Sequence, residues 1–222
     1  VLELGMSGLG EIAKLADAVR PEVGVITNIG VSHLEKLGSR ENILKAKLEL
    51  ADALPDGAPL FLCGDNDLLR QVKNDRLKVV YYGLDGADCQ IRAVNVRDER
   101  EGTAFGIRSP WGDFEARIPA IGQHNVYNAL AAFAVGCAMD VPPAQAAAAL
   151  ADYAPSGMRQ RLVPFRGATV VEDCYNASPD SVLAALKTLA AYPAKGRRIA
   201  VLSDMLELGE IAEKAHREAG AW

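Results

Sequence analysis

Short apolar runs alternate with helical patterns through roughly the first 83 of the 222 residues of this chain. Strands are expected at residues 1–4, 23–29, 59–63 and 78–82. Helices are expected at 9–19, from Ser39 onward and, in a short stretch, near 67–73. Ser39 is a good N-cap residue, with Glu41 in the first turn. Because strands joined by helical crossovers build a parallel sheet, we expect an α/β fold with helices on both faces of a mostly parallel sheet.

Residues 89–118 have a different pattern. Three short runs, 90–96, 103–108 and 113–118, are separated by the polar stretches 98–102 and 109–112. Runs joined by such turns are typical of antiparallel strands. We therefore expect a small antiparallel sheet in addition to the parallel strands. Helical patterns over 125–139 and 143–153 follow it.

The strongest linker signal is Pro155-Ser156-Gly157, which places a domain boundary near residue 156. A second βαβα unit follows it, with strands expected at 169–174 and 198–202 and helices at 179–192 and 207–221. Two strands cannot make a stable parallel domain. We therefore expect 157–222 to be the truncated start of a second domain, and the whole chain to be an excerpt of a longer protein.

The composition argues against several classes of protein. A formal net charge of -5 disfavours sequence-independent nucleic-acid binding, which needs a basic face. The four cysteines lie far apart without C-x-x-C spacing, which favours reduced thiols in a cytoplasmic protein over a zinc or disulfide framework. No run approaches the ~18 apolar residues of a membrane span, and no signal peptide is visible.

Lys47 lies on an apolar helical stripe. At about 100° per residue, the apolar residues between 43 and 54 fall on one side of the helix with Lys47 at their centre, whereas Lys45, Glu49 and Asp52 point away. A desolvated ammonium group costs several kcal/mol unless it is paired or chemically altered. Lys47 is therefore either a snorkelling lysine at the edge of a core or part of a functional site.

Two further polar side chains follow the ends of expected strands. Glu3 lies near the end of the first strand, ahead of a glycine-rich stretch at 5–10, and His33 lies three residues after Gly30. Because ligands collect at the carboxyl ends of parallel strands, we expect Glu3, His33 and Lys47 to converge on one crevice. A carboxylate and an imidazole there suit a hard divalent cation that also holds phosphates.

Several runs of this sequence resemble the Mur ligases, ATP-dependent enzymes that form amide bonds in peptidoglycan synthesis. Residues 3–8 (ELGMSG), 27–35 (TNIGVSHLE) and 46–49 (AKLE) resemble the family's central domain, and 122–132 (GQHNVYNALAA) resembles its nucleotide-contacting helix start. Residues 173–179 (DCYNASP) and 204–209 (DMLELG) resemble the branch that adds D-alanyl-D-alanine to UDP-N-acetylmuramoyl-tripeptide.

The resemblance implies a domain plan. Residues 1–156 would be the central ATP-binding domain, of P-loop type, without its N-terminal phosphate-loop portion, and 157–222 the start of the Rossmann-like C-terminal domain. No G-x-x-x-x-G-K-[ST] loop occurs in this sequence, and the family carries that loop upstream of the position of Glu3. These residues alone are therefore expected to be inactive. Separately, we expect the protein to be a monomer.

The resemblance also implies roles for particular residues. Glu3 and His33 match positions that bind Mg²⁺, and Lys47 matches a lysine that carbon dioxide carbamylates, giving an anion that helps hold a magnesium ion. This modification accounts for a buried lysine, because it replaces a cation by a carboxylate-like group beside metal charge. Lys47, His33 and Glu3 are the expected catalytic residues. The residues expected to contact ATP are Asn28, Asn125, Asn128, Arg159, Asp173, Tyr175 and Asn176.

Two more histidines are expected to have no catalytic role. His124 neighbours the nucleotide contacts, and His216 lies on a charged helix face where solvation is expected.

The reaction that the resemblance implies is phosphoryl transfer followed by acyl transfer. The tripeptide carboxylate attacks the γ-phosphate of ATP, and the amine of D-alanyl-D-alanine then displaces phosphate from the acyl phosphate.

Other functions stay open. One is another Mur ligase branch, which adds an L-amino acid or a diamino acid, and another is folylpolyglutamate synthase, which shares the central-domain plan. Residues 173–179 argue against both, more decisively against the synthase. A non-catalytic nucleotide-binding or scaffolding module is the alternative of a different class. It is disfavoured because Glu3, His33 and Lys47 are all retained.

Overall fold

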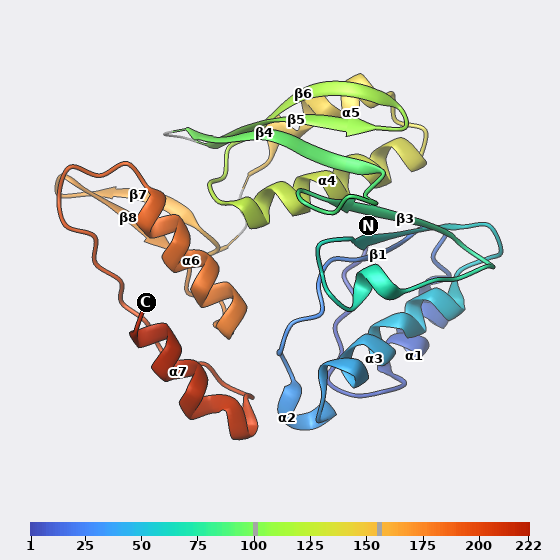
Figure 1. Ribbon diagram of the computed structural model, residues 1–222, viewed down its shortest axis with the longest axis horizontal. Helices are drawn as coiled ribbons and strands as arrows, with labels where there is room; N and C mark the ends of the chain where they lie inside the picture. Colours follow the sequence, from blue (N-terminus) through green and yellow to red (C-terminus); the bar gives the residue numbers. More distant parts are fainter. Residues whose placement is uncertain (100–101, 155–156) are drawn as a thin grey trace.

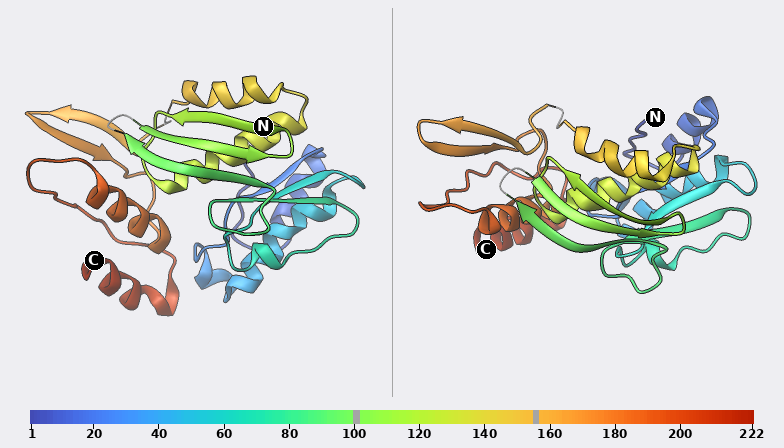
Figure 2. Two further views of the ribbon diagram at one scale, coloured as in Figure 1. Left: turned by 45° about the horizontal axis from the view of Figure 1, so that its top comes forward. Right: turned by 90° about the horizontal axis from the view of Figure 1, so that it is seen from above.

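The computed structural model describes residues 1–99, 102–154 and 157–222. A larger part contains a six-stranded sheet and five helices, and a smaller part from residue 157 onward contains a two-stranded sheet and two helices (Figure 1). Seen from the other sides, the small sheet extends away from the large one (Figure 2). The domain boundary expected near residue 156 falls outside the described residues.

The strands of the large sheet are β1 (Gly24–Ile26), β2 (Pro59–Cys63), β3 (Lys78–Gly83), β4 (Ile91–Glu99), β5 (Gly102–Ser109) and β6 (Gly112–Ile118). The helices of this part are α1 (Glu11–Val19), α2 (Leu34–Leu37), α3 (Arg40–Ala53), α4 (Gln123–Ala138) and α5 (Pro143–Ala149), with 3₁₀ turns η1 (Leu69–Gln71) and η2 (Leu150–Asp152). These bounds confirm the expected strand at 59–63. The other five strands lie close to those expected at 23–29, 78–82, 90–96, 103–108 and 113–118.

The strand order is β1-β2-β3-β4-β5-β6. The pairs from β1 to β4 are parallel, and the pairs from β4 to β6 are antiparallel. The expected antiparallel meander is therefore confirmed, and it continues the parallel strands within one sheet because Tyr82 pairs with Ile91 and Gly83 with Arg92. The mixed α/β fold class is confirmed.

Both faces of β2 are covered. Leu60, Phe61 and Leu62 follow one another and are each at most 1% exposed, and successive strand residues point to opposite faces. In Figure 1, α4 lies on one side of β1–β3 and α1 and α3 lie on the other. The start of α3 is fixed by its N-cap. The Ser39 hydroxyl accepts the N–H of Asn42 at 3.2 Å, as the sequence predicts.

The smaller part contains β7 (Arg161–Phe165), β8 (Ala168–Glu172), α6 (Pro179–Ala191), η3 (Gly209–Ile211) and α7 (Ala212–Gly220). β7 and β8 form an antiparallel hairpin that the sequence analysis missed. Its two turn residues, Arg166 and Gly167, have φ of 47° and 82°. Two positive φ values are typical of a type I′ turn, for which Asn-Gly is the usual signal. Arg-Gly gives a weaker one.

Two expected strands are wrong. Residues 1–4 and 198–202 form no strand. Leu2, Ile199 and Val201 are 68%, 68% and 92% exposed. An apolar run becomes a strand only where a neighbour satisfies its backbone groups, and neither segment has a ladder partner among the described residues.

A small apolar cluster holds the second part together. Val182, Met205, Leu208 and Ala215 are its buried members, and Val31 of the first part packs against them. The two parts are therefore in contact through this cluster. Across the described ranges, no helix combines the length and the apolar character that crossing a membrane requires.

Candidate functional site

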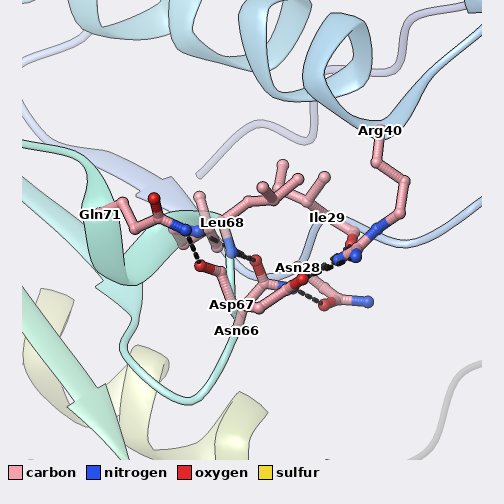
Figure 3. Close-up of polar contacts among 8 residues, drawn as sticks. Asn28, Ile29, Arg40, Asn66, Asp67, Leu68 and Gln71 are labelled. Carbon is pink, nitrogen blue, oxygen red and sulfur yellow. Dashed lines mark hydrogen bonds and ion pairs between the residues drawn. The ribbon is translucent and has the colours of Figure 1, made fainter.

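The chain just after β1 is held by two other elements. The Lys47 Nζ on α3 donates a hydrogen bond to the backbone carbonyl of Asn28 at 2.7 Å. The Asn66 side-chain amide, which follows β2, donates to Asn28 Oδ1 at 2.8 Å and to the carbonyl of Ile29 at 3.3 Å (Figure 3). The carboxyl ends of β1 and β2 are thereby joined to each other and to α3.

A second cation of α3 extends this network. Arg40 donates to the carbonyl of Ile29 at 2.8 Å and makes a two-bond contact with the Asp67 carboxylate at 2.8 and 2.5 Å (Figure 3). The Asn66 Oδ1 accepts the N–H groups of Leu68 and Leu69 at 3.2 and 3.0 Å. Neither Asn66 nor Asp67 was predicted from the sequence. Their place directly after an apolar strand is the signal that could have found them.

Lys47 lies at the edge of the core, with Ile43 and Ala46 of the same helix fully buried beside it. Its hydrogen-bond acceptor is a carbonyl, which carries no net charge. Burial therefore lowers the pKa of Lys47 below the ordinary value. A lysine with a lowered pKa carries more neutral amine at a given pH, and neutral amine is the form that reacts with electrophiles.

Glu49 was expected to point away from the apolar side of α3, and its half-buried carboxylate binds the start of α1. Its carboxylate accepts the N–H of Gly10 at 2.6 Å and of Ala13 at 3.0 Å. It thereby caps α1, whose own N-cap residue Gly10 has no side chain to do so. The Ser7 N–H donates to Glu11 at 2.7 Å. Amide groups of the glycine-rich stretch are thus already bound to carboxylates, which argues against a phosphate cradle there.

Glu3 and His33 lie on irregular segments. Glu3 is exposed, and His33 precedes α2 with a φ of 62°. The His33 Nδ1 lies 2.6 Å from Glu207 Oε2 of the second part. All three expected catalytic residues are described, and no hydrogen bond or ion pair links Glu3, His33 and Lys47 to one another. Their convergence stays a prediction.

The expected metal-binding residues supply one carboxylate that suits magnesium but not a complete cage. Within residues 1–99, 102–154 and 157–222, no group of three or more His, Cys, Asp or Glu side chains is placed to hold a metal ion. Mg²⁺ is commonly held by one or two carboxylates together with phosphates and water. The Glu3 carboxylate fits that pattern, whereas the His33 imidazole is a less usual ligand for magnesium.

The start of α4 contacts the second part. The His124 Nε2 and the Asn125 Nδ2 each lie 2.9 Å from Gln160 Oε1, and Asn125 also donates to the carbonyl of Ile121 at 2.9 Å. The Asn125 Nδ2 also lies 3.1 Å from His124 Nε2, so this ring nitrogen faces both a carbonyl oxygen and an amide nitrogen. Burial lowers the pKa of His124, although the Gln160 hydrogen bond opposes this. His124 is half-buried at the junction of the two parts, and the expectation that it has no catalytic role stays a prediction. Gln160 is a contact that the sequence analysis missed.

The other expected nucleotide contacts are exposed. The Arg159 guanidinium carbon lies 4.3 Å above the ring centroid of Tyr175, so the structure brings these two together in a cation–π contact. Asn176 Oδ1 accepts the N–H of the next residue at 2.9 Å. Asp173 and Asn128 lie on the surface, at the end of β8 and on α4 respectively.

His216 was expected to be solvated, and its side chain is 37% exposed, but the ring also makes contacts within the second part. Its Nε2 accepts the N–H of Met205 at 3.0 Å, and its Nδ1 lies 2.8 Å from the carbonyl of Ala212. Both ring nitrogens are thus satisfied within the second part. The helical pattern of α7 could not show this contact, because Met205, whose N–H donates to the His216 ring, lies outside the helix.

Asp65 fixes the loop that follows β3. Its carboxylate accepts the N–H groups of Leu84, Asp85 and Gly86 at 2.6, 3.1 and 2.5 Å and the Tyr127 hydroxyl at 2.9 Å. Burial opposes ionisation of Asp65, but these donors outweigh it and lower its pKa. Asp65 was not predicted from the sequence. The carboxyl ends of β2 and β3 are therefore held against α4.

Two family models match the chain. The Mur ligase middle domain matches residues 1–136, and the Mur ligase, glutamate ligase domain matches residues 158–222. The UDP-N-acetylmuramoyl-tripeptide--D-alanyl-D-alanine ligase of Bacillus subtilis (strain 168) is 40% identical over 222 residues, which are 100% of this chain and 48% of that protein.

Solved structures agree. The structure of MurF from Acinetobacter baumannii has a TM-score of 0.90 at 27% identity and covers 99% of this chain and 48% of its own. That of MurF ligase from Thermotoga maritima in complex with ADP has a TM-score of 0.87 at 26% identity, over 100% of this chain and 51% of its own. The chain therefore spans about half the length of the relatives it matches.

Replacement of Asn66 by alanine is expected to lower the free energy of unfolding by about 2–3 kcal/mol, because buried backbone groups lose their partners. Urea denaturation measures this. Gln145→Ala on the exposed face of α5 is the control and should change stability by no more than about 0.5 kcal/mol. Equal effects of the two substitutions would contradict the role assigned to Asn66.

The pKa of His124 gives a pH-dependent prediction. Since folding lowers this pKa below 6.5, the unfolded chain binds more protons than the folded chain between the two values. Wild-type stability should therefore fall relative to His124→Gln as the pH drops through that window, and the two should change in parallel above it. Urea denaturation across the window measures the difference, with Gln145→Ala as a variant that should follow the wild type. Parallel curves for His124→Gln and the wild type throughout would contradict the buried, neutral state.

Proposed function

The chain belongs to the Mur ligase family, and from this premise we propose that it is the middle part and the start of the C-terminal part of an ATP-dependent ligase that joins D-alanyl-D-alanine to UDP-N-acetylmuramoyl-tripeptide. The observation that carries the proposal is 40% identity, along the whole chain, to a Bacillus subtilis protein of that name. The ADP in the related Thermotoga maritima structure supports ATP as the co-substrate.

The proposed nucleotide site draws on both parts of the chain. Asn125 and Asn128 lie on α4 of the first part, and the second part contributes Arg159, Asp173, Tyr175 and Asn176, with Asn28 at the end of β1. Contact between the two parts through Gln160 supports a site at their junction. The Arg159 cation, held over Tyr175, is the group proposed to bind phosphate oxygens.

Glu3 and His33 are the residues proposed to hold magnesium, together with Lys47 as its carbamate. In that modification the neutral amine of Lys47 forms a carbon–nitrogen bond to carbon dioxide and releases one proton. The lowered pKa of Lys47 favours the neutral amine that this reaction needs. Bound magnesium would supply positive charge that offsets the repulsion between the substrate carboxylate and the triphosphate.

The chain's own groups position the reactants. The tripeptide carboxylate attacks the γ-phosphorus and ADP leaves. The D-alanyl-D-alanine amine then attacks the acyl carbon, phosphate leaves and the amine loses a proton. The network of Asn66, Arg40 and Lys47 fixes the strand end beside which this occurs. A junction closed by the second part would exclude the water that otherwise hydrolyses the acyl phosphate.

The proposed reaction predicts ADP release that depends on one amine. The full-length gene product, given ATP, Mg²⁺ and UDP-N-acetylmuramoyl-tripeptide, is expected to release ADP with D-alanyl-D-alanine and not with L-amino acids, diaminopimelate or glutamate. Release only with another of these amines would assign the protein to another branch of the family. Absence of release with every amine would contradict a ligase function.

Lys47→Ala is expected to lower turnover by about 10- to 100-fold or more while the fold is retained, because a group that holds the metal is lost. Circular dichroism and thermal denaturation check the fold. Lys45→Ala, on the exposed face of the same helix, is the matched control and should keep near wild-type turnover. Near wild-type turnover of Lys47→Ala would identify Lys47 as a lysine at the edge of the core without a catalytic role.

A further inference from the structure

The run at 204–209 touches the turn that contains His33. Glu207 Oε2 lies 2.6 Å from His33 Nδ1, across the junction of the two parts. The Nδ1 atom is buried from solvent, while the His33 side chain as a whole is 36% exposed. The exposed area of the ring therefore lies away from Nδ1. The contact is close but bent, without the straight geometry of a hydrogen bond, so its strength is mainly electrostatic.

The backbone on both sides is shaped for this contact. His33 and Glu207 both have left-handed backbone conformations, with φ of 62° and 60°. Such a conformation is unfavourable for a residue other than glycine, so the surrounding structure must hold it. The Glu35 N–H donates to the Glu207 carbonyl at 3.5 Å, and Gly209 packs against Glu35.

Apolar packing supports the same junction. Met205 and Leu208, on either side of Glu207, are 5% and 3% exposed, and Val31 packs against their cluster. The contact itself is partly exposed, with the Glu207 side chain at 45%, and partly exposed contacts of a carboxylate add little to stability. His33 and Glu207 thus both have an unfavourable backbone conformation that their surroundings hold in place, although the contact between their side chains is weak. This combination indicates a role for the contact other than stability.

A histidine that ligates a metal through one ring nitrogen commonly gives the proton of the other to a carboxylate, which fixes its tautomer and orientation. We propose that Glu207 is a positioning residue for His33, which keeps the proton on Nδ1 and leaves the Nε2 lone pair free for magnesium. This inference rests on the proposed function. It means that the metal site of the first part is complete only when the second part is docked.

The test uses four variants of the full-length gene product: Glu207→Ala, Glu207→Gln, Glu207→Gly and His33→Ala. Glycine removes the carboxylate while accepting the positive φ, which separates the side chain from the backbone. Glu210→Ala, an exposed glutamate on the same segment, is the matched control. One readout is the ¹⁵N signal of the His33 ring in metal-free protein. The other is the dissociation constant of Mg²⁺ in the presence of ADP.

In the wild type and in Glu210→Ala, the ring signal is expected to report a proton on Nδ1. Glu207→Ala and Glu207→Gly should lose this preference and raise the Mg²⁺ dissociation constant by about 10- to 100-fold. Glu207→Gln, whose amide oxygen keeps the position but not the negative charge, should recover only part of both.

Wild-type Mg²⁺ affinity in Glu207→Gly and Glu207→Ala, together with weakened affinity in His33→Ala, would overturn the role of Glu207 and leave the proposed function standing. Wild-type affinity in His33→Ala would overturn the proposed metal role of His33 and this inference with it. A ring signal that is the same in the wild type and Glu207→Gly would also overturn the positioning role.

Discussion

The carboxamide of Asn66, which follows β2, binds the segment after β1 and the start of the turn η1 at the point where the parallel strands end. It is only 8% exposed, its nitrogen serves Asn28 and Ile29 after β1, and its oxygen serves the two amide groups that open η1. Parallel strands leave such backbone groups unpaired at their ends, and buried ones must find partners. The path of the chain from β1 toward His33 is therefore held in part by a side chain that follows β2. Lys47 and Arg40 then fix α3 to the same place.

The sequence predicted the features that periodicity and local chemistry determine. The β2 run and the Ser39 cap are local signals, and both are confirmed. Strands at 1–4 and 198–202 were wrong because an apolar run does not reveal whether a neighbouring strand will pair with it. At the candidate site, helical spacing singled out Lys47 and the family resemblance singled out Asn28, but neither could show that the Asn28 carbonyl accepts a hydrogen bond from Lys47.

The residues missed by the sequence share a physical reason. Glu49, Asp65 and Gln160 each bind groups that are distant along the chain, and a hydrophobic pattern says only which face of an element turns inward.

Two glycines at the junction of the two parts also have contacts that are distant along the chain. A Cβ on Gly30 would lie 2.5 Å from Asp180 Oδ2, and one on Gly122 would lie 2.7 Å from Thr188 Oγ1. Both positions permit close approach of the second part.

The carboxylates that bind backbone amides have a thermodynamic consequence for any ligand of these strand ends. Asp65 holds three successive amides of one loop, and Glu49 holds the glycine-rich segment before α1. Fixing backbone removes conformational entropy worth about 1–2 kcal/mol per residue. In this chain that entropy is lost during folding, so ligand binding need not order these segments again. The loops are preorganised, and more of the intrinsic interaction energy can appear as affinity.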